Sequence, residues 1–204
     1  MNRVKQQLSI LTPIIYTFIL CLVLLTISRL LLMVWQWPRV DEANGLFNII
    51  TSGVRVDVST LCSLLIIPAL ITCFLSSNTL IGRIWNRVLR VWITFTIWLI
   101  VYMEVVTVPF IIEYDLRPNR LFIEYLIYLK EVFGMLFSGY KLELFIGLLV
   151  TIVSLVLGWK FSRKLVQNIR SPKWYTRFFI ALLVLLLGAL GSRSSLGHRP
   201  MNPA

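Results

Sequence analysis

Residues 8–34 read LSILTPIIYTFILCLVLLTISRLLLMV, an almost unbroken apolar run that decides how the rest of the chain is interpreted. A helix needs roughly 20 apolar residues to cross the hydrocarbon core of a bilayer, so this run predicts a membrane-spanning helix. Arg29, Trp35 and Trp37 stand where a signal peptide would carry small residues and a cleavage site. We therefore expect the run to remain in the protein as an uncleaved anchor.

Four further apolar runs follow the first one along the chain. Hydrophobic residues make up 58% of the 204 residues, a share typical of membrane proteins. The sequence therefore predicts an all-α, polytopic membrane protein with five transmembrane helices. Their predicted ranges are 8–34, 58–75, 91–112, 142–161 and 174–192.

The charged residues are sorted between alternate connections. The segments 1–7, 76–90 and 160–177 carry Lys and Arg but no Asp or Glu, and they account for the whole net charge of +11. An excess of cations in short loops marks the cytoplasmic side of a membrane protein. We therefore expect a cytoplasmic N-terminus and an extracytoplasmic C-terminus. Because the cations lie in short loops rather than on a separate basic domain, nucleic acid is not an expected partner.

The connection between the third and fourth runs predicts an additional helix at the outer surface. Over residues 119–137, Arg120, Glu124, Tyr128 and Glu131 recur at helical spacing and form one polar stripe on an otherwise apolar segment. The segment is too short to span, so we expect an interfacial amphipathic helix capped by Asn119. A weaker case of the same kind exists for residues 42–51, before a turn at Gly53.

Arg29 and Glu104 are charged residues inside the predicted spans. Arg29 lies about 31 Å along the first helix from Leu8, and Glu104 about 21 Å along the third from Arg90. Both belong to the outer half of the membrane, and intramembrane charges seek partners. We predict an Arg29–Glu104 ion pair, with Arg55 as a competing partner for the carboxylate. The pair is either a headgroup or substrate contact, or a clamp between helices.

The residues give no sign of catalysis or of a resident metal. Cys21, Cys62 and Cys73 are scattered through the predicted spans, and His198 has no neighbouring ligand in sequence. We expect neither catalytic residues nor a cofactor in this chain. The basic segment 160–177 offers six cations near the membrane, each worth on the order of 1 kcal/mol of attraction to anionic lipid. The bilayer and its anionic lipids are therefore expected partners.

Several outward-facing segments resemble a known family. They are GVRVD at 53–57, EYDLRPNRLFIEYL at 113–126, Glu131-Val132 and RSSLGHRPMNPA at 193–204. Together they are similar to the membrane portion of the lipoteichoic acid synthase family, phosphoglycerol transferase-like sulfatases of the alkaline-phosphatase superfamily. The resemblance implies five spanning helices in a bacterial cytoplasmic membrane, followed by an extracytoplasmic catalytic domain.

In that family the catalytic domain uses a threonine nucleophile and a divalent metal, commonly manganese, to transfer a phospholipid headgroup. Neither has a counterpart here, and we expect residues 193–204 to be the beginning of a linker to such a domain. The resemblance thus implies an anchor that positions a catalytic domain near the outer leaflet. The residues expected to face headgroups or that domain are Arg55, Asp57, Arg117, Asn119, Arg120 and Glu124. Two alternatives stay open: a small transporter or channel, and a noncatalytic partner subunit.

Overall fold

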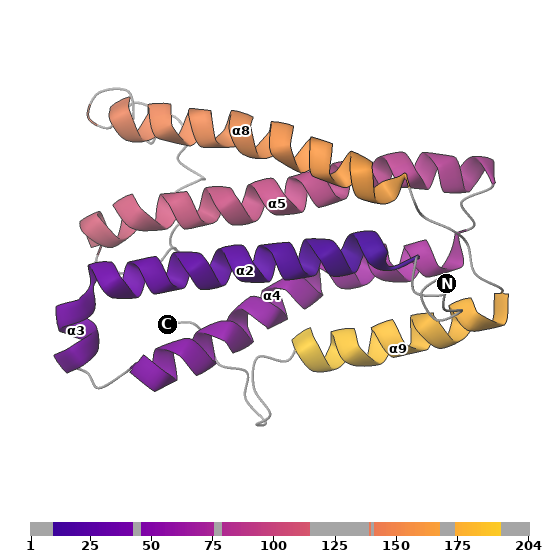
Figure 1. The fold of residues 1–204 in the computed structure, drawn as a ribbon, viewed down its shortest axis with the longest axis horizontal. Coiled ribbons are helices and arrows are strands. Elements are labelled where there is room, and N and C mark those ends of the chain that lie inside the picture. The colour runs from indigo at the N-terminus through magenta and orange to yellow at the C-terminus, as the bar shows by residue number, and fades with distance from the viewer. Residues whose placement is uncertain are drawn as a thin grey trace.

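The computed structural model describes residues 10–42, 46–75, 79–114, 139, 141–167 and 174–192. Within these ranges all regular secondary structure is helical, so the predicted all-α class is confirmed (Figure 1). The helices are α2 (Thr12–Trp35), α3 (Trp37–Glu42), α4 (Leu46–Phe74), α5 (Leu80–Tyr114), α8 (Lys141–Val166) and α9 (Trp174–Ser192).

The five predicted spans overlap α2, α4, α5, α8 and α9 in turn. The first four of these helices are long and apolar enough to cross a membrane, whereas the apolar part of α9, Tyr175–Gly191, is shorter. Large apolar side chains also face outward, including Leu31 (66% exposed), Leu149 (50%) and Phe179 (68%). Apolar surface of this extent requires an apolar environment. The chain is a multi-pass, α-helical membrane protein.

Helix α4 begins well before its predicted start. It runs unbroken from Leu46 through Gly53, so the predicted turn at Gly53 and the separate helix at 42–51 are both wrong. The hydroxyl of Thr51 donates to the carbonyl of Phe47 at 2.8 Å, one helical turn earlier. The predicted span began at residue 58 because polar residues precede it. A helix forms its own backbone hydrogen bonds, however, and can extend beyond the apolar run.

The helices form two extensively packed pairs, α5 with α8 and α4 with α9, and α2 contacts members of both pairs. Figure 1 shows α2 between α5 and α4. One buried cluster joins Cys21 of α2, Leu61 of α4, Ile93 of α5 and Val166 of α8. Because α2 contributes to this cluster and also contacts both pairs, it holds the bundle together.

Small and hydroxylated residues bring α5 and α8 close together. The hydroxyls of Thr94 and Ser162 lie 3.1 Å apart, and the indole N–H of Trp98 donates to the Thr151 hydroxyl at 3.3 Å. Gly158 of α8 faces Thr94 as well. Close approach at small residues and hydrogen bonds between helices are the usual means of packing within a bilayer, where lipid is as apolar as the helix surface.

The five long helices alternate in direction (Figure 1). This alternation places a group of cations at one end of the bundle and the acidic residues of the described chain toward the other end. The first turns of α5 and α9 and the last turns of α8 lie at one end. They carry Arg83, Arg87, Arg90, Lys160, Arg163, Lys164 and Arg177. In the described chain, the acidic residues belong instead to α3, the first half of α4, the last half of α5 and the start of α8.

The predicted interfacial helix at 119–137 and the linker at 193–204 lie outside the described residues. Both stay predictions. The described helices α5 and α8 end and begin on the side from which the interfacial helix would emerge, and α9 ends on that same side (Figure 1).

Candidate functional site

The polar site lies where the last turns of α2 meet the first half of α4. Arg29 is six residues before Trp35, the last residue of α2, and therefore about 9 Å from that helix end. Asp57 lies about three turns after Leu46, where α4 begins. Because α2 and α4 run in opposite directions, these positions come side by side.

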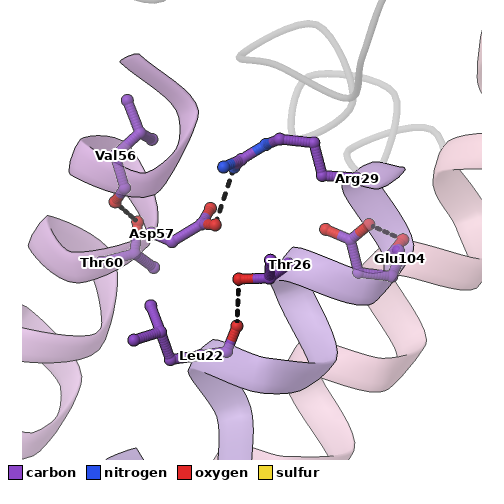
Figure 2. Close-up of polar contacts among 8 residues, drawn as sticks. Leu22, Thr26, Arg29, Val56, Asp57, Thr60 and Glu104 are labelled. Atoms are coloured by element: carbon purple, nitrogen blue, oxygen red, sulfur yellow. Dashed lines mark hydrogen bonds and ion pairs between the residues drawn. The ribbon is translucent and has the colours of Figure 1, made fainter. Parts of the chain in front are cut away.

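Arg29 and Asp57 form a buried ion pair. Nη2 of Arg29 donates to Oδ2 of Asp57 at 2.7 Å, and the two side chains are 7% and 9% exposed (Figure 2). Charge-assisted hydrogen bonds are among the stronger polar contacts in proteins. Removing one member of a buried pair leaves the other charge without compensation, which is costly. The pair therefore fixes α2 against α4.

The predicted Arg29–Glu104 pair is wrong: Arg29 binds Asp57 instead. Glu104 accepts a hydrogen bond from the hydroxyl of Ser28, the residue before Arg29 (Figure 2). The prediction failed because Asp57 was placed at the membrane boundary. The earlier start of α4 places Asp57 within a helix, and its carboxylate faces α2 rather than the headgroups.

Ser28 and Arg29 together connect α2 to two neighbours. Successive residues on a helix point about 100° apart, so Ser28 faces α5 while Arg29 faces α4. The helix-clamp interpretation of the intramembrane charges is the one that these contacts support. Sequence reasoning missed Ser28, and a hydroxyl next to an intramembrane arginine was the only signal for it.

Gly53 explains how the guanidinium fits against α4. It lies one turn before Asp57 on the same face of the helix. A Cβ at Gly53 would lie 2.1 Å from Cζ and 2.4 Å from Nη1 of Arg29. Only a residue without a side chain lets the α4 backbone approach the guanidinium this closely. Gly53 therefore serves close packing and does not form a turn.

An open pocket of about 300 Å³ adjoins the pair. Its walls come from α2, α3, α4 and α5 and are almost entirely apolar. The lining residues are Arg29, Leu32, Met33, Gln36, Val40, Ile49, Gly53 and Ile111. Among the described residues, Nη1 of Arg29 is a buried side-chain nitrogen with no hydrogen-bond partner. A strong donor thus lies beside an apolar pocket.

Among the other predicted outer-face residues, Arg55 is described, and it is not part of this site. Arg55 is exposed on α4, two residues from Asp57 and hence on another face of the helix. Its predicted competition for the Glu104 carboxylate has no counterpart in the ion pair observed. Arg117, Asn119, Arg120 and Glu124 lie outside the described residues.

In the part of the chain that the structure describes, no three His, Cys, Asp or Glu side chains come together as a metal site would require. The site is thus a buried ion pair with an adjoining apolar pocket in a multi-pass membrane protein. No protein-family model matches the chain, and no solved structure matches it.

Proposed function

We propose that the chain is a membrane anchoring and positioning domain. Its N-terminus is cytoplasmic, its C-terminus is extracytoplasmic, and the membrane is a bacterial cytoplasmic membrane. The domain holds an extracytoplasmic phosphoglycerol transferase-like catalytic domain of the alkaline-phosphatase superfamily near the outer leaflet. The catalytic domain supplies the nucleophile and the metal, whereas this chain supplies attachment and position.

The observation that supports this proposal most strongly is the collection of cations at one end of the bundle. Lys160, Arg163 and Lys164 are exposed at the end of α8, and Arg83 and Arg87 are exposed at the start of α5. Long cationic side chains at helix ends extend to the headgroups. With this end in the cytoplasm, α9 ends at the outer surface, where the chain would continue into the catalytic domain.

The polar contacts of the outer half favour a positioning role. The Ser28–Glu104 contact attaches α2 to α5, and the Arg29–Asp57 contact attaches α2 to α4, near the proposed outer surface. A domain that must hold a catalytic centre at a fixed height needs outer helix ends that do not shift relative to one another. Arg55, Arg117, Asn119, Arg120 and Glu124 are the residues that we assign to headgroup or domain contacts.

The described residues give no observation that favours the transporter, channel or partner-subunit alternatives. Arg29, Asp57 and Glu104 are charged residues well inside the helices, and all three lie in the same half of the bundle. A path lined by charged groups across a bilayer would need charged residues at other depths too.

The proposal is tested by enzymatic activity associated with the chain. The tagged chain is isolated in mild detergent from the membranes of its natural host, and manganese-dependent release of glycerol phosphate from phosphatidylglycerol is measured. We expect turnover in this material and none from the same chain produced alone in vesicles. Arg117→Glu should lower the turnover. Solute flux through vesicles containing the chain alone, without associated turnover, would contradict the proposal.

A further inference from the structure

Arg29 has hydrogen-bonding capacity that its ion pair does not use. Its guanidinium is committed to Asp57 through Nη2, while Nη1 is buried without a partner among the described residues. A buried donor left without an acceptor costs about 1–3 kcal/mol, and more when the group is charged. The side chain also lines the pocket of about 300 Å³, so the nitrogen without a partner belongs to a guanidinium that borders this pocket.

The charge of the site favours an uncharged acceptor. Arg29 and Asp57 compensate each other at 2.7 Å, and the site as a whole carries no excess positive charge. A second anion would meet the same guanidinium but would also be repelled by the Asp57 carboxylate in surroundings of low polarity. A carbonyl oxygen accepts a hydrogen bond without this repulsion.

The pocket walls favour an alkyl chain as the rest of the ligand. Leu32, Met33, Val40, Ile49 and Ile111 supply aliphatic surface, and the volume lies at the lower end of the range for small-molecule sites. Leu32 and Met33 follow Arg29 on α2, and Ile49 precedes Gly53 on α4. Arg29 thus supplies a donor at one end of the pocket, Gln36 is the other polar residue of the lining, and most of the remaining wall offers hydrophobic contact.

The depth of the site identifies the source of the acceptor. Trp35 and Trp37 mark the membrane interface, where tryptophan is enriched. Arg29 lies about 9 Å from Trp35 along α2. Headgroup regions account for the difference between a core of about 30 Å and a bilayer of about 40–45 Å. Arg29 is therefore near the boundary between headgroups and chains, which is where glycerolipids carry their ester groups.

From these observations we infer that the pocket binds one acyl chain of a diacyl glycerolipid whose ester carbonyl accepts a hydrogen bond from Nη1 of Arg29. The ligand is a structural lipid recognised by its linkage and chain rather than by its headgroup. Binding of this lipid requires only that the chain is inserted into a bilayer. The inference therefore goes beyond the proposed function and does not depend on an external catalytic domain.

The test compares two lipids that differ only in the linkage. The purified chain is titrated with a diester phosphatidylglycerol and with its diether analogue of equal chain length and headgroup, and bound lipid is counted by native mass spectrometry. Because a hydrogen bond to a charged group is worth about 1.5–3 kcal/mol, we expect the diester to bind about tenfold more tightly or better. A diester phosphatidylcholine should bind as well as the phosphatidylglycerol.

Two sets of variants locate the binding. Ile49→Trp fills the pocket and should abolish the tight binding, whereas Ile67→Trp, a lipid-facing isoleucine elsewhere on α4 that is 57% exposed, should leave it unchanged. The double variant Arg29→Met with Asp57→Val removes both buried charges together, which a helix bundle tolerates better than the loss of one. In it the preference for the diester should disappear while the protein remains folded.

Three results would overturn the inference. Equal binding of diester and diether lipids would show that no carbonyl is recognised. A preference for anionic over zwitterionic headgroups, whatever the linkage, would identify an anion site instead. Tight binding that survives Ile49→Trp would place the lipid elsewhere. None of these measurements uses turnover, so the inference and the proposed function can fail separately.

Discussion

Among the described residues, one end of the bundle carries exposed and half-buried cations, whereas the other end also contains a buried ion pair. At the end formed by the first turns of α5 and the last turns of α8, the side chains of Arg83, Arg87, Arg163 and Lys164 are exposed. At the other end, Arg29 and Asp57 are buried against each other, with side chains 7% and 9% exposed. We expect the positive charge of the first end to set the orientation in the membrane, whereas the ion pair at the second end attaches α2 to α4.

This difference predicts unequal costs of removing an arginine. Arg29→Ala leaves Asp57 buried without a partner and should lower the free energy of unfolding by about 3–5 kcal/mol. Arg83→Ala removes an exposed cation and should change it by no more than about 0.5 kcal/mol. Denaturant unfolding in mixed micelles, followed by circular dichroism, measures both variants. Restored stability in the Arg29→Met with Asp57→Val variant would show that the unpaired charge causes the loss. Equal stability of Arg29→Ala and the unchanged chain would argue against a buried pair.

Two helical glycines should respond with opposite signs. Gly53→Ala places a Cβ 2.1 Å from Cζ of Arg29 and should destabilise the protein by about 1–3 kcal/mol, a typical cost of overpacking. Gly147, in α8, has open space around its Cβ position, so Gly147→Ala should stabilise by up to about 1 kcal/mol through helix propensity. The unfolding assay described above distinguishes the two. A stabilising Gly53→Ala would mean that the guanidinium is free to move aside.

The hydroxyl that joins α2 to α5 should have a smaller effect. Ser28→Ala removes the donor to Glu104 and should cost about 1 kcal/mol, since the contact is only partly buried. Ser63→Ala removes an exposed hydroxyl that donates to the carbonyl of Ser59 within α4, and little change is expected. The rate of thermal inactivation in detergent is a second readout for both. Similar losses in the two variants would leave Ser28 without a special role.

The spanning helices and the sorting of charges between alternate connections could be predicted from sequence, because both depend on local information. Apolar length identifies a spanning helix wherever it occurs, and the acid-free loops follow from counting Lys, Arg, Asp and Glu. The alternating directions of α2, α4, α5, α8 and α9 agree with that prediction. The orientation relative to the two sides of the membrane stays a prediction.

The partner of Arg29 could not be predicted, because it depends on which helices are neighbours and on where α4 begins. Asp57 and Glu104 both lie in the half of the bundle that holds Arg29, so depth alone cannot choose between them. Arg29 pairs with Asp57 because α4 approaches its guanidinium closely at Gly53. The Glu104 carboxylate accepts a hydrogen bond from Ser28 instead. The predicted contacts of Arg117, Asn119, Arg120 and Glu124 lie outside the described residues and stay predictions.

The most direct test of the account is the side of the membrane reached by each end of the bundle. Single cysteines replace Ser171, in the connection between α8 and α9, and Ser195, after α9, in a chain whose own three cysteines are changed to alanine. An impermeant maleimide is added to intact cells. We predict labelling at position 195 and none at 171 until the cells are opened. Labelling of 171 but not 195 in intact cells would reverse the topology and contradict an anchor for an external catalytic domain.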